Sequence, residues 1–184
     1  AVYGMNVAAP ALAKVELRQA ILRAVNRDAI RAAQFPGAAT MTGLVGPGAA
    51  GRRDNACGTA CAYDVAAAKA LVATAYPKGG VPEVHVDYFS DAAGREAKMA
   101  DAIAADLRAV GIPSTPRAHT VAELGALVAS GGAEMFRYGW IGSYPSADAY
   151  LAPFERRGVD NVFSLDDEQL STLIDQARKA TSDA

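Results

Sequence analysis

The side chains best suited to bind a ligand lie between residues 135 and 151, in the segment MFRYGWIGSYPSADAYL. This segment holds the only tryptophan of the chain beside one guanidinium and several hydroxyl and carboxyl groups: Trp140, Arg137, Tyr138, Ser143, Tyr144 and Asp148. Aromatic rings offer apolar surface, and an arginine can hold an anionic group through two hydrogen bonds. Glycines at 139 and 142 let the backbone approach a ligand closely. The segment is therefore a candidate binding surface.

Two residues of this segment also have a structural explanation. Trp140 could fill the hydrophobic core, because aromatic side chains are usually packing residues. Arg137 could form a structural salt bridge, with Glu134 or Asp148 as its partner. Both alternatives stay open at the level of the sequence.

The sequence contains no recognised catalytic arrangement. It lacks a G-x-S-x-G nucleophile elbow, an H-E-x-x-H pair and a phosphate loop ending in Lys-Ser/Thr. Gly46, Gly48 and Gly51 match the letters of the dinucleotide fingerprint, but no helical pattern follows to present an N-terminus to a pyrophosphate. A nucleotide-binding enzyme remains an alternative that rests on these glycines alone. We expect no catalytic residues, no metal site and no cofactor.

The two cysteines, Cys57 and Cys61, lie close together in a predicted loop. Such a pair forms either a short disulfide or half of a metal site. His85 and His119 could complete four zinc ligands, but their separations match no known zinc spacing. We expect a disulfide, and with it an oxidising compartment, rather than two free thiols.

The composition is that of an ordinary globular domain. The 184 residues are 51% hydrophobic and 21% charged, which is enough for one hydrophobic core. The formal net charge of -2 provides no basic field for nucleic acid or an anionic membrane. No apolar run approaches the roughly 18–20 residues that cross a bilayer. The chain opens like the interior of a strand and ends without a cap, so we expect a piece of a longer protein.

Strand and helix patterns alternate along the chain. The expected strands are residues 2–7, 83–89, 112–118 and 134–138, with an extended segment at 161–165. The expected helices are residues 14–25, 29–33, 65–75, 92–110, 121–129, 147–153 and 169–179. This alternation predicts an α/β fold with a mixed sheet flanked by helices, interrupted by a long loop at 35–62. Ligands bind such sheets beyond the carboxyl ends of the strands, and the Trp140 segment is expected at one of these ends.

Two local signals sharpen this scheme. Ser90 or Asp91 should cap the helix at 92–110, and Glu96 should lie on its outward face. Pro113 and Pro116 cannot donate to a sheet ladder, so the strand that contains them should lie at an edge or be irregular.

Several stretches, taken in order, resemble the oligopeptide- and dipeptide-binding proteins of bacterial ABC importers, which are extracellular solute-binding proteins of family 5. The stretches are VYGMNVAAPAL with VELRQAILRAVNRDAI, YDVAAAKALVATA, AIAADLRAVGI and GW…YPSADAYL. Together they span nearly the whole chain. The resemblance implies a lobe of the periplasmic-binding-protein type II fold, with residues 1–184 as the C-terminal ligand-binding lobe. In such receptors two lobes close on the ligand like a hinged clamp.

The same resemblance implies roles for individual residues. Arg137 matches an arginine that can meet the negative end of a ligand, Trp140 would line the pocket wall, and Asn6 would lie near the cleft. In peptide binders an Asp three residues after the Trp grips the α-ammonium group, but here that position is Ser143. A neutral hydroxyl forgoes a charge-assisted contact worth roughly 1.5–3 kcal/mol, which counts against ordinary peptides. Asp148 is out of register to replace it.

The resemblance predicts a non-enzymatic lobe that binds a peptide or peptide-like solute and delivers it to an ABC permease. The protein would lie outside the cytoplasm, in the periplasm or at the cell surface, with a lipid anchor in its full-length form. The predicted ligand-binding residues are Trp140, Arg137, Ser143, Tyr144, Tyr138, Asp148 and Asn6. An alternative from another class is a transport-incompetent relative that regulates the cell envelope through a partner protein, with which Ser143 is compatible.

Overall fold

A mixed sheet forms the centre of the protein. The computed structural model describes residues 2–140, 142–156, 158 and 160–179. Within these residues the sheet has the order β1-β4-β2-β3, and its strands are β1 (Val2–Met5), β2 (Val84–Phe89), β3 (Ser114–His119) and β4 (Met135–Tyr138). β2 is parallel to both β3 and β4, whereas β1 is antiparallel to β4. The predicted α/β fold is confirmed, and the proline-containing β3 lies at an edge as expected.

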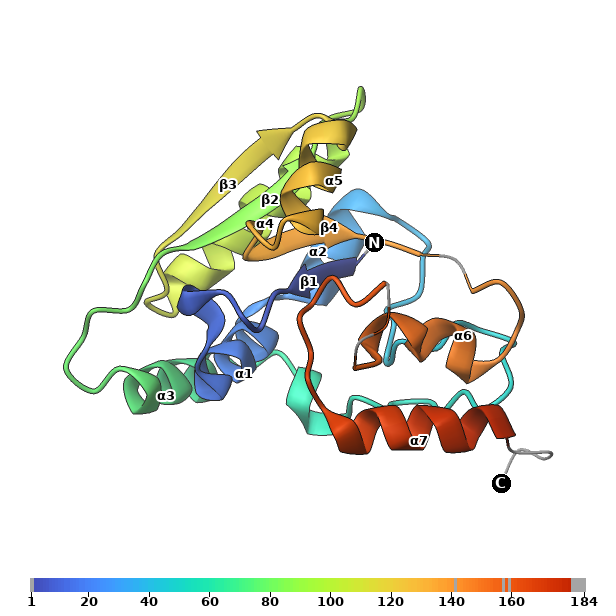
Figure 1. Ribbon diagram of the computed structural model, residues 1–184. Coiled ribbons are helices and arrows are strands. Elements are labelled where there is room, and N and C mark those ends of the chain that lie inside the picture. Colours follow the sequence, from blue (N-terminus) through green and yellow to red (C-terminus); the bar gives the residue numbers. More distant parts are fainter. Residues whose placement is uncertain (1, 141, 157, 159, 180–184) are drawn as a thin grey trace.

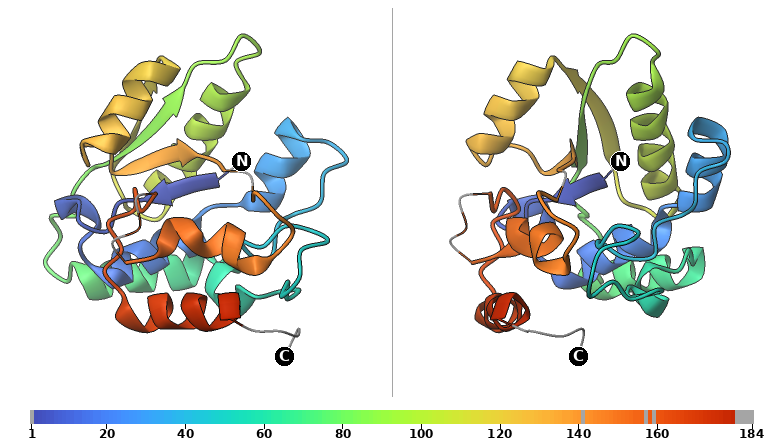
Figure 2. Two further views of the ribbon diagram at one scale, coloured as in Figure 1. Left: turned by 45° about the vertical axis from the view of Figure 1, so that its right-hand side comes forward. Right: turned by 90° about the vertical axis from the view of Figure 1, so that its right-hand side faces the viewer.

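Helices lie on both faces of this sheet and below it in the view of Figure 1. The helices are α1 (Val15–Ala24), α2 (Arg27–Gln34), α3 (Val65–Ala75), α4 (Arg95–Ala109), α5 (Val121–Ala129), α6 (Ala147–Leu151) and α7 (Glu168–Lys179), with 3-10 helices η1 (Pro10–Leu12), η2 (Gly58–Cys61) and η3 (Ala152–Phe154). Figure 2 shows α4 and α5 on opposite faces of the sheet. In the described part of the chain, no helix combines the length and the apolar character needed to cross a bilayer.

The larger core lies on the α4 face. It joins β2 and β4 to α1, α3 and α4 through buried aliphatic side chains, among them Leu12, Leu17, Ile21, Val84, Val86 and Leu107. Each of them stabilises the fold by roughly 1.5–3 kcal/mol through removal from water. Asp64 begins α3 by accepting a hydrogen bond from the Ala67 amide at 2.9 Å, as expected of an N-cap.

The smaller core lies on the α5 face and is largely aromatic. Leu124 and Val128 of α5 pack with Phe136, which is fully buried, and with Phe163 from the C-terminal segment. The rings of Phe136 and Phe163 are stacked at 5.8 Å. A Cβ at Gly4 would lie 2.2 Å from Phe163, so this close approach to β1 requires glycine. This core fixes the C-terminal segment against the sheet.

The start of α4 differs from the expected helix. It begins at Arg95, after Gly94 with a φ of 62°, rather than at residue 92. Asp91 still accepts a hydrogen bond from the Glu96 amide at 3.0 Å. The predicted contact of Asp91 with the start of the helix therefore exists, but the predicted first residue of the helix was wrong. Glu96 is buried, 7% exposed, and not outward, because it pairs with a side chain of the sheet.

The long loop at 35–62 is confirmed, apart from η2. Cys57 and Cys61 form a disulfide, with their Cα atoms 5.6 Å apart. Arg27 reaches this turn and donates from Nη1 to the Cys61 carbonyl at 2.9 Å. The disulfide closes a short ring at the end of the loop, and the Arg27 hydrogen bond fastens this ring to α2.

The glycine-rich stretch 46–51 lacks the context of a nucleotide site, because no helix opens at its end. It packs instead on α6: the Ala50 amide donates to the Pro145 carbonyl and the Ala147 amide donates to the Ala50 carbonyl, both at 2.8 Å. A Cβ at Gly46 would lie 2.7 Å from the Tyr150 hydroxyl. Close packing on Tyr150 therefore explains the glycine, and the dinucleotide interpretation is wrong.

The extended segment expected at 161–165 is also wrong. These residues form a turn that the Asn161 side chain closes with two hydrogen bonds. Asn161 Nδ2 donates to the Leu165 carbonyl at 2.7 Å, and the Leu165 amide donates to Asn161 Oδ1 at 3.1 Å. Ser164 has a φ of 56°. Because the asparagine satisfies the backbone locally, the segment needs no partner strand.

Candidate ligand-binding groove

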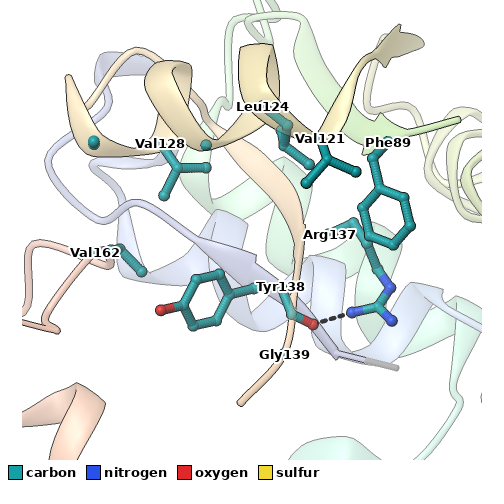
Figure 3. A pocket seen from close by; sticks show the side chains of 10 residues that line it. Phe89, Val121, Leu124, Val128, Arg137, Tyr138, Gly139 and Val162 are labelled. Atoms are coloured by element: carbon teal, nitrogen blue, oxygen red, sulfur yellow. Dashed lines mark hydrogen bonds between the residues drawn. The ribbon is translucent and has the colours of Figure 1, made fainter.

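A groove opens where β2 and β4 end, between these strands and α5 (Figure 3). Its volume is about 460 Å³. Its lining residues are Phe89, Val121, Leu124, Gly125, Val128, Ala129, Arg137, Tyr138, Gly139 and Val162. Pockets of roughly 300–1,000 Å³ with mostly apolar walls are typical of small-ligand sites. The groove also lies at the carboxyl ends of parallel strands, where α/β sheets bind ligands.

The alternation of side chains along β4 decides which residues face this groove. Tyr138 points to the α5 side, where its ring meets Phe136 at 6.0 Å and Phe163 at 5.5 Å. Burial, and then the negative charge of Asp160, raises the pKa of Tyr138 above its ordinary value. The ring therefore presents a neutral hydroxyl beside an apolar wall.

Arg137 lies at the end of the groove near Phe89, with its guanidinium carbon 5.5 Å from that ring's centre. Its Nε donates to Glu96 Oε2 at 2.9 Å, and Nη1 donates to the Tyr138 carbonyl, the bond drawn in Figure 3. The predicted salt bridge thus exists, but the partner is Glu96 of α4, not Glu134 or Asp148. Helical periodicity predicted an exposed Glu96, because a pattern within one helix contains no information about Arg137 on a distant strand.

Tyr3 of β1 pairs with Arg137 across the sheet. Its hydroxyl is buried and, within the described residues, has no hydrogen-bond partner. Burial raises the pKa of Tyr3, Glu96 raises it further, and Arg137 acts in the opposite sense. The hydroxyl therefore stays protonated in the physiological range.

Trp140 is half-buried and stands beside the groove. Its ring packs against Tyr138 at 5.9 Å and Phe154 at 5.7 Å, and Nε1 donates to the Tyr150 carbonyl at 3.1 Å. As far as the chain is described, the lining residues of the groove do not include it. Trp140 is neither sealed in the interior nor part of the wall; it supports Tyr138.

Of three other predicted residues, Tyr144 and Asp148 form a separate pair near α7, and Ser143 precedes them in the same segment. Ser143 and Tyr144 are exposed, the Tyr144 hydroxyl donates to Asp148, and Asp148 is 6% exposed. Arg178 of α7 lies 3.8 Å from that carboxylate. The hydrogen bond to Asp148, together with burial, raises the pKa of Tyr144. Ile141, within the same segment, lies outside the described residues.

Asn6 lies at the other end of the sheet. Val2 pairs with Tyr138 whereas Met5 pairs with Met135, so the residue after β1 is far from Arg137 along the sheet. Asn6 is buried, donates from Nδ2 to the Gly131 carbonyl and accepts from the Ala8 amide, both at 3.0 Å. The structure therefore gives it a turn-stabilising role and does not bring it together with Arg137.

The sequence analysis also missed an ionic cluster on β2 and β3. Arg117 donates to both carboxylate oxygens of Asp87 at 2.8 Å, and His119 Nε2 lies 2.7 Å from Asp87 Oδ1. Only the parallel register, in which Asp87 pairs with Arg117, could have indicated it. Nowhere in the described residues do three His, Cys, Asp or Glu side chains gather as metal ligands.

Comparison with known proteins places this architecture. The family model described as "Bacterial extracellular solute-binding proteins, family 5 Middle" matches residues 1–161. OppA of Burkholderia pseudomallei superposes with a TM-score of 0.85 at 19% identity, covering 98% of this chain and 37% of that one. AgaA of A. tumefaciens R10, solved with agropinic acid, superposes with a TM-score of 0.77 at 27% identity, covering 98% of this chain and 37% of that one. DppA of Helicobacter pylori, solved with the peptide STSA, superposes with a TM-score of 0.84 at 22% identity, covering 98% of this chain and 35% of that one.

No curated protein sequence matches this chain. The chain spans little more than a third of the length of the three solved proteins. OppA and DppA, at their low identities, establish the fold alone, while the family model covers most of the sequence. The chain belongs to the bacterial extracellular solute-binding proteins of family 5.

Proposed function

We propose that residues 1–184 form the C-terminal lobe of an extracytoplasmic receptor that binds a peptide or peptide-like solute for an ABC importer. The observation that carries this proposal is the apolar groove at the carboxyl ends of β2 and β4, where Arg137 and Tyr138 meet α5. The lobe is a binding module and not an enzyme. The receptor lies in the periplasm or at the cell surface, where a lipid anchor holds its full-length form.

The ligand lies between this groove and a second lobe outside the chain. Phe89 and Tyr138 give it aromatic surface, and Arg137 lies at the edge of the same space. Trp140 acts through Tyr138, and the exposed Ser143 and Tyr144 face the solvent beyond it. The peptide in DppA and the agropinic acid in AgaA support a small polar solute that need not be an ordinary peptide.

A Trp140→Ala variant tests this site. Removing the indole takes away the packing that holds Tyr138 at 5.9 Å, so the groove wall loosens. Isothermal calorimetry of the full-length receptor with a tripeptide library should show about tenfold weaker binding, equal to about 1.4 kcal/mol. Tyr63→Ala, which truncates an exposed ring in the distant loop region, is the matched control and should bind as the wild type does. Unchanged affinity in Trp140→Ala would remove the support for this site.

A further inference from the structure

α5 has a glycine at its centre that its surroundings do not require. Gly125 is the middle residue of this nine-residue helix, where glycine is a poorer helix former than alanine. A Cβ added at Gly125 would meet no heavy atom within 4 Å, and the backbone there has no positive φ. Neither close packing nor backbone conformation therefore explains the residue.

What Gly125 does touch is the groove. It lies one helical turn from both Val121 and Ala129, and all three line the same wall. Val121 is 69% exposed, so this part of the wall is open to an incoming group. Figure 3 shows Val121 and Val128 pointing from α5 toward Phe89, Tyr138 and Val162 on the other side. The missing side chain thus leaves open the middle of a slot between two apolar walls.

The slot has little net charge to offer. Among its described lining residues only Arg137 is charged, and Glu96 neutralises that guanidinium at 2.9 Å. A charged ligand group placed here would lose its water without gaining an unpaired partner. An apolar group would gain both walls, because burial of apolar surface is favourable.

We propose that Gly125 determines specificity: it makes room for one uncharged aliphatic or aromatic group of the bound solute. This inference rests on the proposed function of the chain as a ligand-binding lobe. The occupant is a ligand group and not another part of the receptor, because the slot is continuous with Arg137, Tyr138 and Gly139 at the strand ends. Its volume of about 460 Å³ is in the range of small-ligand pockets.

The test compares five tripeptides, Ala-X-Ala with X as Ala, Leu, Phe, Lys or Asp, by calorimetry on the full-length receptor. The wild type should bind the Leu or Phe peptide about tenfold more tightly than the Ala, Lys and Asp peptides. Gly125→Leu should erase this preference by filling the slot, so that the variant binds the Leu and Phe peptides no more tightly than the Ala peptide. The variant should fold, because nothing lies near the added Cβ and leucine favours the helix.

Ala126→Leu is the matched control, because it adds the same side chain to the neighbouring exposed position of α5 outside the groove. It should keep the wild-type preference. A preference for Leu or Phe that survives in Gly125→Leu, or a wild type that binds all five peptides equally, would overturn the role of Gly125 and leave the receptor function intact. A folded wild type that binds none of the peptides would instead overturn the proposal of a peptide ligand, and this inference with it.

Discussion

Two arginine–carboxylate pairs lie on neighbouring parts of the sheet and differ in geometry. Arg117 holds Asp87 by two parallel bonds of 2.8 Å, and His119 adds a third contact to the same fully buried carboxylate. Arg137 donates to Glu96 through Nε alone, and its Nη1 donates to the Tyr138 carbonyl. The Asp87 carboxylate is fully buried although Arg117 is 36% exposed, whereas Arg137 is 17% exposed and lines the open groove.

This difference separates structure from binding. The Asp87 pair joins the edge strand β3 to the central strand β2, and the bidentate bond raises the pKa of Arg117 above its ordinary value. The Glu96 pair joins α4 to the end of β4 and sets the charge beside the groove. The same chemical pair therefore fastens the sheet in one place and tunes a candidate site in the other.

Breaking the first pair should have the largest effect on stability. Asp87→Ala leaves Arg117 and His119 without their buried partner, which should lower the free energy of unfolding by about 3–5 kcal/mol. Urea denaturation followed by circular dichroism measures this. The control is Asp54→Ala, which removes the same group from an exposed pair with Arg52 and should cost less than about 1 kcal/mol. Equal losses in the two variants would contradict the comparison.

Breaking the second pair should change stability less and binding more. Glu96→Gln keeps an oxygen that can accept from Arg137 but removes the negative charge at residue 96, so the free energy of unfolding should fall by about 1–2 kcal/mol. The uncompensated guanidinium should then bind Ala-Asp-Ala about tenfold more tightly than the wild type does, as measured by calorimetry on the full-length receptor.

Glu155→Gln is the control for this second change. It weakens a glutamate–arginine pair with Arg178 that lies away from the groove. We expect a similar small loss of stability and no gain in affinity for the acidic peptide. A gain in both variants would show that overall charge, and not Glu96, governs the effect.

Local patterns predicted most of the fold. α3 and α5 have the expected bounds, because Asp64 and the Thr120–Glu123 capping box are strong signals within a few residues. The errors arose where distant partners decide. Glu96 looked outward until β4 supplied Arg137, and the segment after Asn161 looked extended although its asparagine closes a turn.

The candidate site was predictable only in part. Arg137 and Tyr138 lie at the end of β4, and their chemistry was visible in the sequence. The opposite wall was missed because Val121, Leu124 and Val128 show the spacing of an ordinary core-facing stripe. Only the packing of α5 over the strand ends turns that stripe into one side of a groove, and this depends on tertiary contacts that no short window of sequence contains.

The smallest expected effect on stability concerns a third buried carboxylate, that of Asp148. Burial alone would raise the pKa of Asp148, but hydrogen bonds from Ser146, Tyr144 and backbone amides outweigh it and lower the pKa below its ordinary value. Folding therefore favours the ionised form, whose contribution is present above the unfolded pKa of about 3.9 and is lost as the pH falls through the lower folded value. In urea titrations the stability gap between wild type and Asp148→Asn should be larger at about pH 7 than at about pH 3. A gap that is the same at both values would mean that Asp148 is held by packing with α7 alone, and that its charge, unlike that of Asp87, contributes nothing to the fold.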